Sequence, residues 1–284
     1  MDIAFLCPLW GSEQLPFETF LANAKHAGYE GVEVAFPKDP VQCAEMVAAI
    51  KHYNLVFVAQ HWDTLTTDFT EHQRAYLARL SQLAETGPLF VNSHSGRDHF
   101  SFEQNKALLD AAEALSQSLG LPIYHETHRG RFNFAAHVTQ QFLQAMPGLQ
   151  LTADFSHWCC VAESLLEDQQ EAVNAAIARS FHVHCRVGHS QGAQVVATGL
   201  PEYAEALERH LGWWVAIAQA ALARGQRLLT FTAEFGPAPY MLPNPATGAP
   251  IANQWAQNVD IMRRVRARVQ QTLAKSPVGS AARG

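Results

Sequence analysis

Eight short apolar runs recur along the chain at about the length of one βα unit, and this repeat constrains the fold more than any other feature. Stretches with helical periodicity separate the runs, and several of these stretches end in a glycine, a common helix stop. Strands that alternate with helices form parallel sheets. Eight such units therefore predict an α/β fold, a single (β/α)8 TIM barrel. The runs cover residues 3–8, 31–36, 55–60, 88–93, 121–126, 149–154, 180–185 and 227–234.

An open, doubly wound sheet is the alternative architecture. Such a sheet normally carries a glycine-rich phosphate-binding turn after its first strand, and the sequence CPLWGSEQ (7–14) offers none. We therefore expect residues 1–275 to form one barrel and residues 276–284 to form a flexible C-terminal tail.

The composition excludes several classes of partner. A formal net charge of −6 argues against nucleic acid and against anionic membranes, because both bind clustered Lys and Arg. No apolar run approaches the roughly 20 residues that span a bilayer. The N-terminus lacks the basic region and cleavage site of a signal peptide, and the 5 cysteines show no CxxC spacing. We expect a cytoplasmic protein with reduced thiols, and the sequence leaves open whether it is a homo-oligomer.

Polar side chains capable of chemistry stand at the C-terminal ends of the predicted strands. In a parallel barrel all strands end on one rim, and that rim carries the active site. Scattered surface charge would show no such relation to strand ends. The pattern therefore predicts an enzyme. The candidate site residues are Trp10, His61, Trp62, His94, Glu126, His128, Arg129, Arg131, Asp154, His157, His184, Arg186 and Glu234.

Four of these residues, Glu126, Asp154, His184 and Glu234, stand at the ends of four consecutive predicted strands. Carboxylates that meet on one rim repel one another, and their pKa values rise unless a cation neutralises them. Three oxygen ligands and one imidazole suit a divalent ion of intermediate hardness. We therefore expect one divalent metal ion, with Mn²⁺ favoured over Mg²⁺, Co²⁺ or Zn²⁺. Independent salt bridges or helix caps are the alternative explanation.

Short motifs along almost the whole chain resemble the xylose-isomerase-like barrel superfamily of sugar isomerases and epimerases. They are AGYEGVEVAF (27–36), a glutamate on strand five, DFSH (154–157), HVH (182–184) and AEFGP (233–237), in the order found there. The resemblance implies that Glu126, Asp154, His184 and Glu234 hold the metal. It also implies that His157 hydrogen-bonds substrate oxygens, and that Arg186 serves where relatives place an arginine slightly later.

A divalent ion that binds a carbonyl oxygen and the adjacent hydroxyl acidifies the C–H between them by stabilising an enediolate. With Glu126, Glu234 or both as acid and base, and His157 beside them, this chemistry epimerises or isomerises a sugar. We therefore expect a metal-dependent sugar isomerase or epimerase with a small-molecule sugar or sugar-acid substrate. The predicted substrate-binding residues are Trp10, His61, His94, His128, Arg129, Arg131 and Arg186.

Two other reactions compete with this interpretation. Ketose 3-epimerases carry a second glutamate six residues after the strand-five glutamate, and here Phe132 occupies that position. A lyase or decarboxylase is the alternative, with arginines binding the carboxylate of an oxidised sugar. An endonuclease-IV-like metal hydrolase is favoured less, because the net charge is negative.

Four further features have two interpretations each. Glu33 either points into the rim or pairs with core arginines, and His182 is either a ligand or a core histidine. The aromatic residues Trp10, Phe36, Trp62 and Trp158 either form a platform for a sugar ring or seal the barrel mouth. The proline-rich segment 236–250 suggests a lid or a subunit contact with Tyr240 as its anchor.

Overall fold

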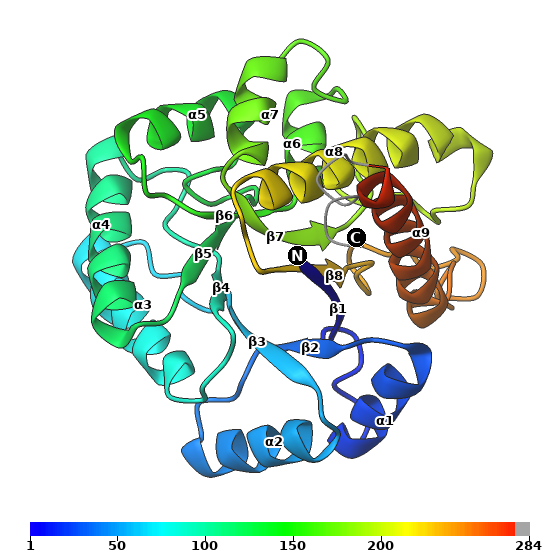
Figure 1. Ribbon diagram of the computed structural model, residues 1–284, viewed down its shortest axis with the longest axis horizontal. Coiled ribbons are helices and arrows are strands. Elements are labelled where there is room, and N and C mark those ends of the chain that lie inside the picture. The colour runs from blue at the N-terminus through cyan, green and yellow to red at the C-terminus, as the bar shows by residue number, and fades with distance from the viewer. Residues whose placement is uncertain (276–284) are drawn as a thin grey trace, which may run out of the picture.

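The computed structural model describes residues 1–275 and shows a closed barrel of parallel strands surrounded by helices (Figure 1). Each strand pairs with the next one along the chain, and β1 pairs with β8 to close the barrel. The predicted TIM barrel is therefore confirmed. The strands are β1 (Asp2–Pro8), β2 (Gly31–Val34), β3 (Val56–His61), β4 (Val91–Ser93), β5 (Ile123–Glu126), β6 (Leu151–Ala153), β7 (Ser180–Cys185) and β8 (Leu228–Ala233).

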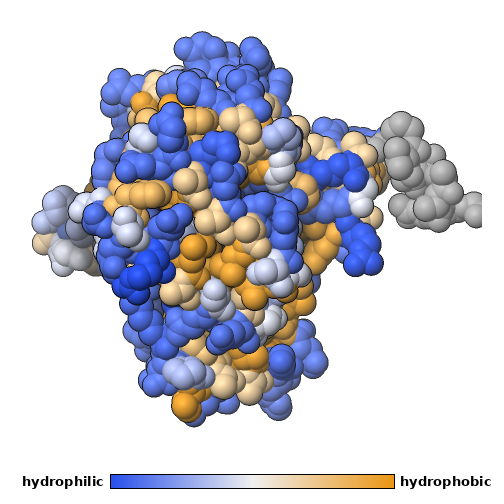
Figure 2. Space-filling model, turned by 90° about the vertical axis from the view of Figure 1, so that its left-hand side faces the viewer, coloured by the Kyte–Doolittle hydropathy of each residue, from blue (hydrophilic) through white to orange (hydrophobic). Residues whose placement is uncertain are grey.

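The helices lie outside the barrel and bury their apolar faces against it. On the side shown in Figure 2, hydrophilic residues cover much of the outer surface and apolar residues are exposed among them. The helices are α1 (Phe17–Ala27), α2 (Pro40–His52), α3 (Phe69–Ala84), α4 (Phe102–Leu119), α5 (Ala136–Ala145), α6 (Ser156–Ala162), α7 (Gln170–Ile177), α8 (Ala204–Ala223) and α9 (Gln254–Ala274), with a 3₁₀ turn η1 (Pro201–Tyr203) before α8.

Local signals in the sequence explain where several helices begin and end. Asp39 caps α2, and Ser101 forms a capping box with Gln104 at the start of α4. Gly28 and Gly120 end α1 and α4 in the left-handed conformation, with φ of 93° and 62°. Helices α6 and α7 were not predicted, and neither has a side-chain cap at its N-terminus.

Every strand overlaps its predicted run, and five of the strands, β2, β4, β5, β6 and β8, are shorter than predicted. The run 31–36 ends as a strand at Val34, because Pro37 follows Phe36 and the Phe36 carbonyl accepts a hydrogen bond from Arg79 instead of a strand neighbour. Strands β6 and β8 also end one residue earlier than predicted, so Asp154 and Glu234 lie one residue beyond them. The parallel order places all these strand ends on one rim.

The tail predicted over 276–284 lies outside the described residues, so the domain division at residue 275 stays a prediction. Within residues 1–275, no helix has the length and apolar character needed to cross a membrane.

Candidate metal centre

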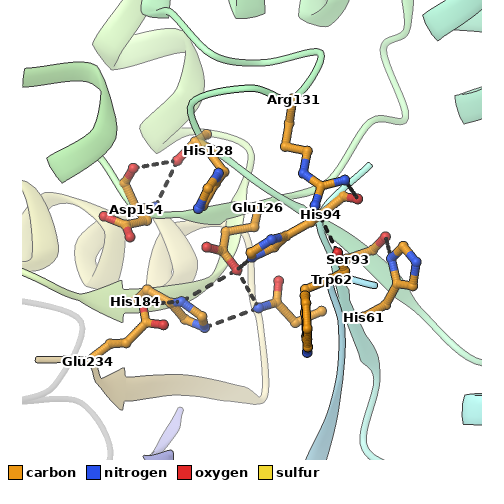
Figure 3. Close-up of polar contacts among 12 residues, drawn as sticks. His61, Trp62, Ser93, His94, Glu126, His128, Arg131, Asp154, His184 and Glu234 are labelled. Atoms are coloured by element: carbon orange, nitrogen blue, oxygen red, sulfur yellow. Dashed lines mark hydrogen bonds and ion pairs between the residues drawn. The ribbon is translucent and has the colours of Figure 1, made fainter. Parts of the chain in front are cut away.

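The four predicted ligands meet inside the barrel mouth. Glu126 is the last residue of β5, His184 lies in β7, and Asp154 and Glu234 follow β6 and β8. Each offers a ligand atom within 4.8 Å of the others, and all four side chains are buried. Figure 3 shows them turned toward a common centre from four different strands. The barrel thus gathers residues up to 108 positions apart, from 126 to 234, into one cluster.

Several atoms of this cluster lack a hydrogen bond although they are buried. His184 Nδ1 lies 2.7 Å from Glu234 Oε2 and 3.5 Å from Glu126 Oε2 as ion-pair contacts. Among the described residues, His184 Nδ1, Glu234 Oε2 and Glu126 Oε1 have no hydrogen-bond partner. Buried polar atoms are rarely left unsatisfied. The oxygens of Asp154 accept hydrogen bonds from Ser156 and Arg186. Three carboxylates and one imidazole with ligand atoms this close together are a donor set that fits a divalent cation.

Burial and charge drive the carboxyl groups of the cluster apart in pKa. Burial raises the pKa of Asp154 to about 7 and also raises the pKa of Glu126. Burial acts the same way on Glu234, but the Arg186 guanidinium and the His184 ring outweigh it and lower the pKa of Glu234 to about 2. Two carboxylates therefore resist ionisation while the third stays ionised, which is the pattern of an acid–base pair.

Arg186 crosses the cluster and joins two of its carboxylates. Its Nε lies 3.2 Å from Asp154 Oδ2, and its Nη2 lies 2.8 Å from Glu234 Oε2. The guanidinium stacks on Tyr240, 4.4 Å from the ring centroid, and faces the ring of Trp10 at 5.3 Å. Arg186 Nη1 is buried and has no hydrogen-bond partner within residues 1–275. This nitrogen is a donor available to a substrate oxygen.

Three histidine rings form a row beside the carboxylates. His94 Nε2 lies 2.9 Å from Glu126 Oε2, the His94 and His128 centroids lie 4.4 Å apart, and His128 lies 3.8 Å from His157. Burial lowers the pKa of all three rings, so they are neutral at pH 7. Both nitrogens of His157 are buried, and neither has a hydrogen-bond partner in the described part of the chain. A neutral ring of this kind can donate to, or accept from, a substrate hydroxyl.

A cavity of about 450 Å³ reaches this cluster at Glu234, which is one of its lining residues. Aromatic side chains and charged groups both line its wall. This combination suits a small polar ligand with an apolar face. A larger cavity of about 1040 Å³ lies between α1 and the segment before α9 and contains none of the four predicted ligands. The smaller cavity is lined by Leu9, Trp10, Glu13, Ala35, Gln60, Trp62, His94, His128, Arg131, Arg186, Glu234 and Tyr240.

Two predicted substrate residues have other partners. His61 is fully buried and uses both ring nitrogens, Nδ1 at 3.0 Å from Ser93 Oγ and Nε2 at 2.7 Å from Thr64 Oγ1. It does not line the cavity, and Ser93 and Thr64 occupy both of its ring nitrogens. Arg131 reaches the cavity wall, but its guanidinium donates to the backbone carbonyls of Trp62, Thr64 and His94. Its contacts therefore hold the β3–α3 loop.

Arg129 lies at the surface, with its guanidinium 4.9 Å from the centroid of the Tyr240 ring. Of the four aromatics proposed as a platform, Phe36 and Trp158 are buried in the core, whereas Trp10 and Trp62 line the cavity. The proline-rich segment contributes Tyr240 to the cavity wall, as expected for an anchor.

Sequence reasoning missed Asn92 and left two alternatives open for Glu33. Asn92 Nδ2 donates to Glu33 Oε1 and to Glu126 Oε2, at 2.8 Å each. Glu33 contacts His182 and His184 inside the barrel instead of a core arginine. A signal for Asn92 was present, because residues two apart on a strand share a face and His94 was already a candidate.

No protein-family model matches the chain, and no curated protein matches it in sequence. Solved structures match its fold. The D-allulose 3-epimerase from Methylomonas sp. has a TM-score of 0.63 at 17% identity, over 94% of this chain and 98% of that one. The 3-keto-D-glucoside 4-epimerase from E. coli has a TM-score of 0.59 at 16% identity, over 94% and 100% of the two chains.

A xylose isomerase-like TIM barrel protein from Mycobacterium smegmatis, in complex with magnesium, has a TM-score of 0.60 at 10% identity, over 94% and 97%. Endonuclease IV from Thermus thermophilus has a TM-score of 0.56 at 14% identity, over 95% and 100%. The chain therefore has the xylose-isomerase-like barrel fold that its motifs predicted. Because this fold also serves an endonuclease, the reaction has to be argued from the site.

Proposed function

We propose that this protein is a divalent-metal-dependent isomerase or epimerase of a small sugar. The observation that carries the proposal is the buried cluster of Glu126, Asp154, His184 and Glu234, whose ligand atoms lie within 4.8 Å of one another and of which Glu234 lines a cavity. Mn²⁺ is the favoured ion, because the donor set mixes oxygen with one imidazole nitrogen. The bound ion would supply Lewis acidity that lowers the pKa of a substrate C–H beside a carbonyl.

The residues around the cluster divide the remaining tasks. Glu234, which the Arg186 guanidinium and the His184 ring keep ionised, would accept the substrate proton. Glu126, whose pKa burial raises, can hold a proton and return it. His157 and Arg186 Nη1 are unpartnered and can hydrogen-bond the substrate oxygens, and Trp10 and Tyr240 cover an apolar face of the ring.

Proton return decides the product. Return to the same carbon from the other side inverts it and gives an epimer, whereas return to the neighbouring carbon gives an aldose–ketose isomer. The two reactions share every residue named above.

A lyase or decarboxylase acting on an oxidised sugar is the second candidate. It is favoured by the free Arg186 Nη1, which suits a substrate carboxylate, and by Phe132. Phe132 is buried and packs on Phe142, with ring centroids 4.9 Å apart, so it offers no second acid at that position.

A proton-exchange experiment separates the candidates. Mn²⁺-loaded protein is incubated in D₂O with a panel of ketoses, aldoses and keto acids, and proton NMR follows each compound. Isomerisation predicts deuterium at one carbon with the carbon skeleton retained, and no exchange in Glu126→Gln or after chelation. Glu30→Gln is the matched control, because Glu30 pairs with Arg266 on the outer side and should exchange like wild type. Loss of CO₂ or water would support the lyase, and no reaction with any compound would refute both.

A further inference from the structure

Glu33 of β2 lies inside the barrel beside the metal cluster but is not one of its four ligands. The side chain is buried, and it does not line the cavity. Its two oxygens are each 3.0 Å from His184 Nε2. Asn92 Nδ2 donates to Oε1 at 2.8 Å, and the Thr232 hydroxyl donates to Oε2. Glu33 is therefore surrounded by donors and acts as an acceptor.

The contacts of Asn92 determine which nitrogen of His184 carries a proton. The Asn92 amide has two N–H groups, and the oxygens of Glu33 and Glu126, each at 2.8 Å, accept both of them. No Asn92 proton is left for His184 Nε2, although that nitrogen lies 3.1 Å from Asn92 Nδ2. Since a carboxylate only accepts, the contact between Glu33 and Nε2 requires a proton on Nε2.

The other ring nitrogen faces the cluster. His184 Nδ1 points to Glu234 Oε2 at 2.7 Å and to Glu126 Oε2 at 3.5 Å. The contact with Glu234 also requires a proton, and a bound metal ion would replace that proton on Nδ1. A histidine that donates through one nitrogen presents the lone pair of the other nitrogen to a metal, and its partner fixes both the tautomer and the ring orientation. We propose that Glu33 is a positioning residue of the metal centre, which holds His184 with Nε2 protonated and Nδ1 as the coordinating atom.

Asn92 extends this arrangement to a second ligand. Its amide links Glu33 Oε1 to Glu126 Oε2, so the residue that orients His184 is joined to the carboxylate on the other side of the cluster. Glu33 and Asn92 thus set the spacing between two ligands that come from β7 and β5. The inference rests on the proposed metal centre and adds two residues beneath it.

Mn²⁺ affinity, measured by titration calorimetry, tests the role of Glu33. Glu33→Leu removes the acceptor, Glu33→Gln keeps one acceptor oxygen, and Glu30→Gln is the control on the outer side. Loss of such an outer partner weakens metal binding by about 10–100-fold. We expect the Kd for Mn²⁺ to rise by this factor in Glu33→Leu, to rise less in Glu33→Gln, and to stay within about twofold of wild type in Glu30→Gln.

NMR of wild-type protein with ¹⁵N-labelled histidine keeps the test decisive if Glu33→Leu fails to fold. With Zn²⁺ as a diamagnetic probe, His184 should show a protonated Nε2 and a metal-shifted Nδ1, assigned by its absence from His184→Gln. A metal-shifted Nε2, or equal Mn²⁺ affinity in wild type and Glu33→Leu, would overturn the role of Glu33 and leave the metal centre standing. Wild-type protein that binds no metal would overturn both.

Discussion

Substitution of Arg131 by methionine tests whether this arginine holds the β3–α3 loop or clamps the substrate. Arg131 is 6% exposed, and burial lowers its pKa to about 10, so the guanidinium stays charged at pH 7. It donates to the carbonyls of Trp62, Thr64 and His94 at 2.8, 3.1 and 3.2 Å. Methionine has a similar length but no donor, so three carbonyls lose their partner.

The expected cost follows from these three bonds. Each buried carbonyl left without a donor costs about 1 kcal/mol, so Arg131→Met should lose about 3 kcal/mol of unfolding free energy. For a chain of 284 residues this loss corresponds to a melting temperature about 5 °C lower. Thermal unfolding followed by circular dichroism measures the shift.

Arg129→Met is the matched control, because Arg129 is an exposed neighbour that stacks on Tyr240. Its melting temperature should stay within about 1 °C of wild type, as is usual for a surface change. If Arg131→Met also melts within about 1 °C of wild type, while substrate binding is lost, the structural role assigned to Arg131 is wrong.

Two further predictions concern a buried histidine and a glycine. His210 accepts from Gly188 N and donates to the Ala206 carbonyl, and burial lowers its pKa to about 4. The His210 ring thus binds a proton less readily in the folded state than in the unfolded chain. The contribution of His210 to the free energy of unfolding is therefore constant above about pH 6.5 and falls as the pH drops below that value. Between pH 7.5 and 5, wild type should lose about 2 kcal/mol more than His210→Gln in urea unfolding, and parallel pH profiles would contradict this. At Gly236 an added Cβ would lie 2.3 Å from the Trp10 ring, so Gly236→Ala should displace Trp10 and raise KM without changing the Kd for Mn²⁺. Gly148→Ala, with no atom within 4 Å of its added Cβ, is the control, and an unchanged KM in Gly236→Ala would exclude Trp10 from the substrate site.

The barrel and the ligand cluster were predictable because both depend on position along parallel strands. Once eight strands alternate with helices, the ends of all strands lie on one rim. A shift of one or two residues in a predicted strand end does not move the four ligands off this rim; they are Glu126, Asp154, His184 and Glu234. An error of one residue in the end of β6 or β8 leaves the carboxylate on that rim.

The direction of side chains at and beyond the strand ends was not predictable. His61 and Arg131 both lie near the rim in sequence, yet His61 turns to Ser93 and Arg131 turns to loop carbonyls. These choices depend on loop conformations that no local pattern encodes. The contact of Glu33 with His184 joins residues 151 positions apart, and it arises only when the barrel closes.

The metal centre itself is tested most directly by anomalous scattering from a crystal of the full chain soaked in Mn²⁺. A single ion is expected at coordination distance, about 2 Å, from Glu126, Asp154, Glu234 and Nδ1 of His184. An ion bound between Glu33, His182 and Nε2 of His184, where three other ligand atoms also converge, would contradict the assigned centre. The absence of any anomalous peak among these strand ends would contradict metal dependence as a whole.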